Sequence, residues 1–183
     1  MIKVFIGGSR RVTRLNADVR RRLDRIIEKR LLVLIGDANG ADKAVQRHLQ
    51  SRGYDRVEVF CMEGICRNNV GNWTTRVVAA PKGARGFEYY AVKDEQMTNE
   101  SSVGFMLWDG KSRGTLANIS RLVEHRKKVV VYIAPTREFA TVRNRGDWET
   151  FLSHWDKESQ KQAKRHAASY ERQLVNTRQV DLF

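Results

Sequence analysis

The sequence contains very little proline and cysteine and no long hydrophobic run. With 2 prolines and 2 cysteines in 183 residues, it is neither collagen-like nor built on a disulfide framework. No run approaches the roughly 20 apolar residues of a membrane-spanning helix. The apolar stretch after Met1 is too short for a secretory signal, so we expect a cytoplasmic protein that does not enter a membrane.

Candidate metal ligands are few and scattered along the chain. Cys61 and Cys66 cannot form a four-ligand zinc site, and we predict that they are reduced thiols with a structural role. The 4 histidines form no short ligand pair: His48, His125, His154 and His166. The sequence therefore predicts no metal site and no cofactor.

Positive charge dominates the composition. Lys and Arg number 34 against 21 acidic residues, which gives a formal net charge of +13. Such an excess favours a polyanionic neighbour or a phosphorylated ligand. Many of these cations lie near the first predicted loop and helix: Arg10, Arg11, Arg14, Arg20, Arg21, Arg22, Arg25, Lys29 and Arg30. This cluster is either a solvated helix face or a nucleic-acid surface.

Short apolar runs alternate with amphipathic stretches, which is typical of β-α-β units. Strands are expected at residues 2–6, 31–35, 57–60, 76–80, 103–108 and 128–133, and helices at 16–30, 41–49, 88–99, 115–126 and 147–174. The unbroken apolar run 31–35 indicates a strand that is covered on both faces. We predict an α/β, Rossmann-like open and mostly parallel sheet with helices on both faces, spanning 1–150, followed by a polar C-terminal helix and flexible tail at 151–183.

Three glycine-containing loops follow predicted strands, at residues 7–10, 36–42 and 109–115. Because the carboxyl ends of parallel strands meet at one sheet edge, these loops should converge there and present unpaired amides to an anion. Arg10 supplies a planar fork for a phosphate. The aperiodic stretch 62–87 predicts a long binding loop as well.

The motifs Gly-Gly-Ser-Arg, Gly-Asp-Ala-Asn-Gly-Ala-Asp and Trp-Asp-Gly-Lys-Ser-Arg-Gly-Thr together resemble those of the SLOG superfamily over about residues 1–134. That superfamily includes DNA-processing protein A, the lonely-guy phosphoribohydrolases and YspA-like proteins. The resemblance implies a Rossmann-like domain that binds a nucleotide or a nucleotide-derived ligand, with its phosphate near the Gly-Thr helix start.

The candidate ligand-binding residues come from these loops, from the end of the strand at 103–108 and from the predicted helix at residues 88–99. They are Gly7, Gly8, Ser9, Arg10, Gly36, Asp37, Ala38, Gly40, Asp42, Tyr90, Lys93, Trp108, Asp109, Gly110, Ser112, Gly114 and Thr115. Trp108, which directly precedes Asp109, is a candidate for stacking on a base, although packing at a strand end is the favoured explanation.

The chain departs from the phosphoribohydrolases at one position. Those enzymes carry a glutamate three residues after the threonine of the glycine motif, and this chain has Asn118 there. An amide cannot act as a base or stabilise a developing positive charge as a carboxylate does. Asp94 and Glu88 are the carboxylates predicted to replace it if the protein is an N-glycosidase acting on a nucleoside monophosphate.

The last five residues, Gln179, Val180, Asp181, Leu182 and Phe183, resemble the bacterial sliding-clamp-binding pentapeptide. The leading hypothesis is therefore a nucleotide-binding protein that is recruited to the sliding clamp. An N-glycosidase and a DNA-binding module resembling DNA-processing protein A are the alternatives. The sequence leaves homo-oligomerisation open.

Overall fold

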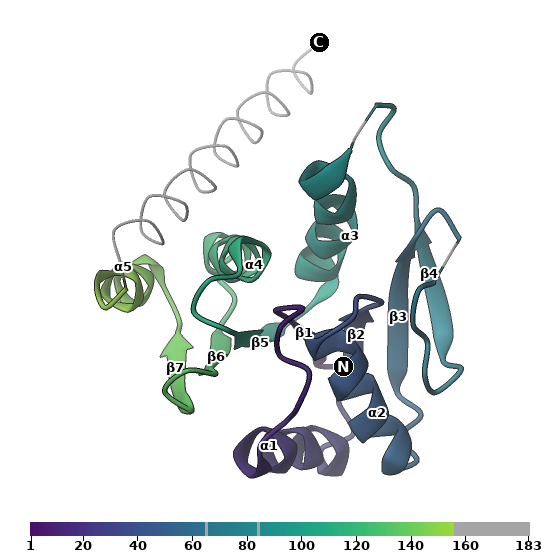
Figure 1. The fold of residues 1–183 in the computed structure, drawn as a ribbon, viewed down its shortest axis with the longest axis horizontal. Coiled ribbons are helices and arrows are strands. Elements are labelled where there is room, and N and C mark those ends of the chain that lie inside the picture. The colour runs from purple at the N-terminus through teal and green to yellow at the C-terminus, as the bar shows by residue number, and fades with distance from the viewer. Residues whose placement is uncertain (65, 84, 156–183) are drawn as a thin grey trace.

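A computed structural model describes residues 1–64, 66–83 and 85–155 (Figure 1). Its strands are β1 (Lys3–Gly8), β2 (Leu32–Gly36), β3 (Val57–Met62), β4 (Thr74–Val78), β5 (Val103–Trp108), β6 (Val129–Ile133) and β7 (Glu138–Val142). Its helices are α1 (Ala17–Glu28), α2 (Ala41–Ser51), α3 (Gly86–Glu100), α4 (Arg113–Glu124) and α5 (Arg145–Ser153).

All seven strands belong to one sheet, in the order β4-β3-β2-β1-β5-β6-β7. Neighbouring strands run parallel except β7, which pairs antiparallel with β6. The chain steps outward from β1 to β4 and then returns to place β5 on the other side of β1. This arrangement confirms the predicted Rossmann-like fold class and puts a topological switch point between β1 and β5.

Helices cover both faces of the sheet, with α1 and α2 on one side and α3, α4 and α5 on the other (Figure 1). Each face has its own apolar core. Val19 and Leu23 of α1 and Val45 of α2 are buried in one. Met97 of α3 and Leu116 of α4 are buried in the other. Alternate residues of the central strands contribute to opposite cores, which explains why those strands read as continuous apolar runs.

Local sequence signals account for several element boundaries. Asn16 caps α1 as predicted, since its side chain accepts a hydrogen bond from the Val19 amide at 2.9 Å. The helix ends at Glu28, two residues before the predicted end. β4 lies within the predicted long loop, two residues before its expected position. The antiparallel edge strand β7 was not predicted, because all its residues except Val142 are exposed or partly buried and the hydrophobic pattern is weak.

The prediction of reduced cysteines is wrong for this structure, in which Cys61 and Cys66 are joined by a disulfide. The two residues are five positions apart, and the turn after β3 brings their Cα atoms to 5.0 Å. Spacing alone did not reveal this closeness. Within the part of the chain that the structure describes, no helix is long and apolar enough to cross a membrane.

Candidate functional site

A cavity of about 530 Å³ opens at the carboxyl ends of β1, β2 and β5. The three predicted loops converge on it although they are far apart in the chain. Its lining includes most of the predicted binding residues: Gly7, Gly8, Ser9, Arg10, Gly36, Ala38, Asp42, Tyr90, Lys93, Asp94, Asp109, Ser112, Gly114 and Thr115. The cavity therefore lies at the switch point, where open α/β sheets bind their ligands.

The first loop depends on a close approach between β1 and β5. A side chain at Gly8 would overlap the carbonyl oxygen of Leu107, so only glycine fits there. Immediately afterwards the Ser9 amide donates to that same carbonyl at 2.9 Å, and the Ser9 hydroxyl accepts from the Arg11 amide at 3.1 Å. These bonds hold the loop in a tight turn and place Arg10 and Arg11 at the cavity.

The second loop is locked against the first. Gly40 has a φ of +86°, and a side chain there would overlap the backbone of Arg10. The Ala41 amide donates to the Ser9 carbonyl at 3.1 Å, which ties the start of α2 to the first loop. The Ala38 amide donates to Asp42 Oδ2 at 3.1 Å. This amide is therefore already paired within the protein.

The third loop is an Asx turn followed by a capped helix. Asp109 Oδ1 accepts from the amides of Lys111 at 3.1 Å and Ser112 at 2.7 Å. Ser112 caps α4 and accepts from the Thr115 hydroxyl at 3.0 Å. The prediction that the amides of these loops are unpaired and face an anion is therefore wrong for several of them. These amides already donate hydrogen bonds to side chains of the protein. In the first turn of α4, the amides of Arg113 and Gly114 have no intrahelical acceptor.

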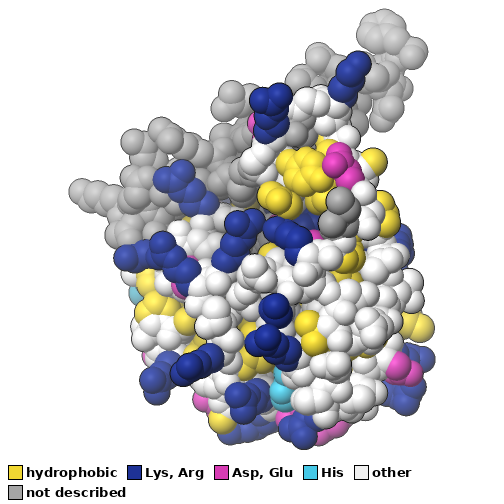
Figure 2. Space-filling model, turned by 45° about the vertical axis from the view of Figure 1, so that its right-hand side comes forward, with side chains coloured by type: hydrophobic (Ala, Val, Ile, Leu, Met, Phe, Trp, Pro, Cys, Tyr) yellow, Lys and Arg dark blue, Asp and Glu magenta, His cyan; other side chains and the backbone are white. Residues whose placement is uncertain are grey.

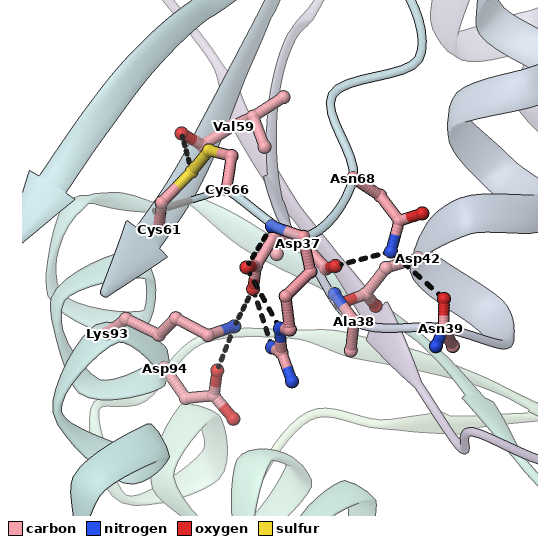
Figure 3. A network of polar contacts seen from close by, with 12 residues as sticks. Asp37, Ala38, Asn39, Asp42, Val59, Cys61, Cys66, Asn68, Lys93 and Asp94 are labelled. Atoms are coloured by element: carbon pink, nitrogen blue, oxygen red, sulfur yellow. Dashed lines mark hydrogen bonds and ion pairs between the residues drawn. A yellow bond between two sulfur atoms is a disulfide. The ribbon is translucent and has the colours of Figure 1, made fainter. Parts of the chain in front are cut away.

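The floor of the cavity is a network of charges centred on Lys93 of α3 (Figure 3). The Lys93 side chain is only 4% exposed, and its Nζ lies 3.6 Å from Asp37 Oδ1 and 3.4 Å from Asp94 Oδ1. A side chain at Gly36 would come within 2.6 Å of both Lys93 Nζ and Asp42 Oδ2. Glycine at the end of β2 thus leaves room for both of these side chains.

Burial and charge act in opposite directions on the pKa values of this network. Burial would lower the pKa of Lys93, but the surrounding carboxylates, led by Asp94, outweigh it and hold that pKa above the ordinary value. Burial raises the pKa of Asp42 to about 6, and the charge of Lys93 offsets this only in part. Burial would also raise the pKa of Asp37, but its Arg67 hydrogen bonds and the nearby Lys93 charge keep it below the ordinary value.

Asn118 and Asp94 are in direct contact. The Asn118 amide group donates from Nδ2 to Asp94 Oδ2 at 2.9 Å, and Arg121 Nη1 donates to Asn118 Oδ1 at 2.8 Å. Asn118 of α4 therefore orients a carboxylate that comes from a different helix, α3. Asp94 and Asn118 both line the cavity.

Tyr90 forms part of the wall between two arginines. The Arg67 guanidinium carbon lies 4.6 Å from the centre of the Tyr90 ring, and that of Arg10 lies 5.7 Å from it. Arg67 is fixed from its other side, because its Nη2 and Nε donate to the two oxygens of Asp37 at 2.7 and 3.0 Å. The wall is thus a preorganised cation–π arrangement.

Five predicted site residues lie outside the cavity lining: Asp37, Gly40, Glu88, Trp108 and Gly110. The prediction of base stacking on Trp108 is wrong, since its ring is fully buried and packs against Phe151 and Trp155. Glu88 is exposed in the first turn of α3 and does not line the cavity. Asp37 and Gly40 instead stabilise the site indirectly. Asp37 holds Arg67 in place by hydrogen bonds, and Gly40 allows the second loop to pack against the first.

Sequence reasoning missed three cations that line the cavity: Arg11, Arg67 and Lys111. Arg11 and Lys111 are exposed at the mouth, and neither forms an ion pair among the described residues. Arg67 comes from the long loop that was expected to bind a ligand, but no local motif marks it. On the face shown in Figure 2, Lys and Arg side chains outnumber acidic ones, in keeping with the net charge of +13.

The pentapeptide of residues 179–183 lies outside the described residues, so the structure does not bear on clamp binding. The predicted helix over 147–174 is described only as far as α5, which begins at Arg145 and ends at Ser153.

Comparison with known proteins gives a likeness in fold. No model of a known protein family matches the chain, and no curated protein does. A solved structure of DNA processing protein A from Helicobacter pylori, described for its single-stranded DNA binding mode, superposes with a TM-score of 0.52 at 14% identity. The match covers 71% of this chain and 64% of that one.

Proposed function

We propose that the cavity binds a nucleotide or another phosphorylated, nucleotide-derived ligand. The observation that carries this proposal is the separation of charge within the site. Lys93 and Arg67, at the floor and wall, are paired with carboxylates, whereas Arg10, Arg11 and Lys111 at the mouth have no ion-pair partner among the described residues. Unpaired cations beside the first turn of a helix form a site for an anionic group.

The remaining lining suits the nucleoside. The phosphate lies at the mouth, near the first-turn amides of α4 and the side chains of Arg10 and Arg11. The polar floor around Asp94 and Asn118 faces the ribose hydroxyls, and the Tyr90 wall faces the base. A cavity of about 530 Å³ is within the size range of small-molecule sites.

Calorimetric titration with nucleoside monophosphates and the corresponding nucleosides tests this proposal. Wild-type protein should prefer the monophosphate, and Arg10→Ala/Arg11→Ala should weaken its binding by about tenfold or more. The matched control is Arg20→Ala/Arg47→Ala, which removes the same charge from exposed positions on α1 and α2. Equal losses in the two variants, or no preference for the phosphate, would overturn the proposal.

Hydrolysis of an N-glycosidic bond is the second candidate function. The observation in its favour is Asp94, whose carboxylate is held by Asn118 and Lys93 on the cavity wall. Water would add to the anomeric carbon as the base leaves with a proton, and Asp94 would stabilise the positive charge that develops on the sugar. Release of free base from a panel of nucleotides, abolished by Asp94→Asn but retained by Glu88→Gln, is the expected result. If no free base is released from any nucleotide of the panel, the protein does not hydrolyse the N-glycosidic bond of those nucleotides.

DNA binding is the alternative that the structural likeness raises. It would use the basic residues of the first loop and of α1, and its affinity would fall steeply as salt increases. Gel shifts with single-stranded DNA at several salt concentrations test it. The cavity is a concave and largely charge-paired site, which favours the small ligand over a strand of nucleic acid.

Clamp docking through Gln179–Phe183 is a separate proposal that rests on sequence alone. An apolar pair at the end of a tail suits a pocket on a partner. Deleting residues 179–183 should abolish co-elution with a bacterial sliding clamp and leave nucleotide binding unchanged. If the truncated chain still co-elutes, the tail does not mediate the contact.

A further inference from the structure

One half of the sheet is only partly covered on the α1 side, although Phe105, Leu107 and Tyr132 of β5 and β6 are buried there. Valines on that face of β2 and β3, such as Val33 and Val59, are fully buried beneath α1 and α2. Val103 of β5 and Val130 of β6 point to the same face but stay partly exposed. Figure 1 shows α4 and α5 only on the opposite side of these strands.

A cleft of about 310 Å³ lies along this partly covered half, between α1 and the strands β5 and β6. Its apolar lining includes Val103, Val130, Ile26 and Leu31, together with the nearly buried Phe105. Among the described residues, the charged side chains that line its rim are all positive: Arg22, Arg25, Lys29 and Lys128.

The rim cations are not engaged by the protein's own acids. None of the four forms an ion pair among the described residues, whereas the neighbouring Arg21 pairs with Asp18 at 3.2 Å on the outer face of the same helix. Arg22 instead lies over the Phe139 ring, with its guanidinium carbon 4.1 Å from the ring centre. Cations left unpaired along an apolar cleft are complementary to a partner that is both acidic and apolar.

We propose that this cleft binds an extended acidic–apolar peptide segment of a partner protein. Arg25 and Lys29 are one helical turn apart, so their side chains start about 6 Å from each other. Alternate residues of an extended peptide repeat at about 7 Å, which lets successive acidic side chains reach these two cations. Apolar side chains of the same segment cover Val103 and Val130.

The floor disfavours single-stranded nucleic acid as the occupant. Such strands bind to basic grooves in which open aromatic rings stack on the bases. Here Phe105 is only 3% exposed, and Arg22 covers the Phe139 ring. The exposed carbon in the cleft is mostly aliphatic, because Phe105 is nearly buried, and this suits the side chains of a peptide.

Fluorescence anisotropy with labelled probes tests the proposal on the full chain. The probes are a short peptide in which Asp and Glu alternate with Leu and Phe, the same peptide with serine at every apolar position, and oligo-dT. The apolar acidic peptide should bind best, and Arg25→Glu/Lys29→Glu should weaken it by about tenfold or more. The control Arg20→Glu/Arg21→Glu makes the same charge change on exposed positions of α1 and should change binding less than about threefold.

Several results would overturn the proposal. Equal losses in both variants would show unspecific charge attraction, and tighter binding of oligo-dT would assign the cleft to nucleic acid. A dimer that Arg25→Glu/Lys29→Glu dissociates would assign it to a second copy of the chain. Tighter peptide binding after removal of residues 156–183 would assign it to the chain's own tail. Circular dichroism checks that each variant is folded.

Discussion

The cavity and the cleft are both lined by basic residues, but the ion pairing of these residues differs. In the cavity, Lys93 is buried and lies within 3.6 Å of two carboxylates. In the cleft, Arg25 and Lys29 have no acidic partner among the described residues. A buried charge must be paired for the protein to fold, whereas an exposed one is free for a partner. Position in the fold, rather than charge itself, separates the two roles.

The same distinction holds inside the cavity. The paired cations at its floor and wall stabilise the fold, whereas the cations at its mouth are the ones that we propose bind the ligand. Substitutions of the same chemical type should therefore affect stability at the floor and binding at the mouth. Matched pairs of substitutions test that division.

Lys93→Met should lower the free energy of unfolding by about 3–5 kcal/mol, because it leaves buried carboxylates without their cation. Lys111→Met is the matched control at the exposed mouth and should change that free energy by less than about 0.5 kcal/mol. Urea denaturation of both variants measures the effect. Equal stability of the two variants would show that the network does not depend on Lys93.

The raised pKa of Asp42 predicts a pH dependence. The folded protein holds a proton on this carboxyl up to about pH 6, against an ordinary pKa of 3.8, so protonation favours the folded state. Its contribution is fully present below about pH 4 and is lost as the pH rises to about 6, with a total of at most about 3 kcal/mol.

Asp42→Asn removes this titration. The free energy of unfolding of the wild type minus that of Asp42→Asn should therefore fall between about pH 4 and pH 6. Denaturation of both proteins across this range measures the difference and cancels the titration of other groups. A difference that stays constant or rises with pH would contradict the raised pKa.

Gly40→Ala should be more damaging than Gly53→Ala, although both glycines have positive φ. Gly53→Ala incurs backbone strain of about 1–2 kcal/mol, and Gly40→Ala incurs at least as much. Only at Gly40 does the added carbon also overlap the Arg10 backbone, which adds roughly 1–3 kcal/mol. Thermal unfolding compares the two variants, and an equal effect would show that the first two loops are not locked together.

The smallest effect is expected in the cleft. Arg25→Ala/Lys29→Ala should change the free energy of unfolding by less than about 0.5 kcal/mol per residue, since these side chains have no ion pair to lose. The measurement is again urea denaturation. A loss near that of Lys93→Met would mean that the cleft cations stabilise the fold and are not free for a partner.

Much of the fold follows from local sequence patterns. Residues 103–108 were predicted as a strand and form β5, because an unbroken apolar run is typical of a central parallel strand. Asn16 could be predicted as the cap of α1 because the interaction is local: its side chain accepts a hydrogen bond from the amide of Val19. The convergence of the three loops also followed, since parallel strands bring their carboxyl ends to one edge.

Features that depend on distant partners could not be read in the same way. Arg67 enters the site through Asp37 and Tyr90, which lie 30 and 23 positions away. Trp108 sits at the end of a strand that is buried on both faces, so sequence alone did not tell whether its ring faced the ligand or the core. The Cys61–Cys66 disulfide depends on the geometry of a turn that no sequence motif predicts.

The central claim is that the ligand's phosphate lies at the mouth of the cavity. Its most direct test is an NMR titration of the full chain with a nucleoside monophosphate, following backbone amide shifts. The amides of Arg10, Arg113 and Gly114 should move most, while those of Val103 and Val130 in the cleft should stay in place. Shifts centred on the cleft, or no shifts with any of the common nucleoside monophosphates, would contradict the claim.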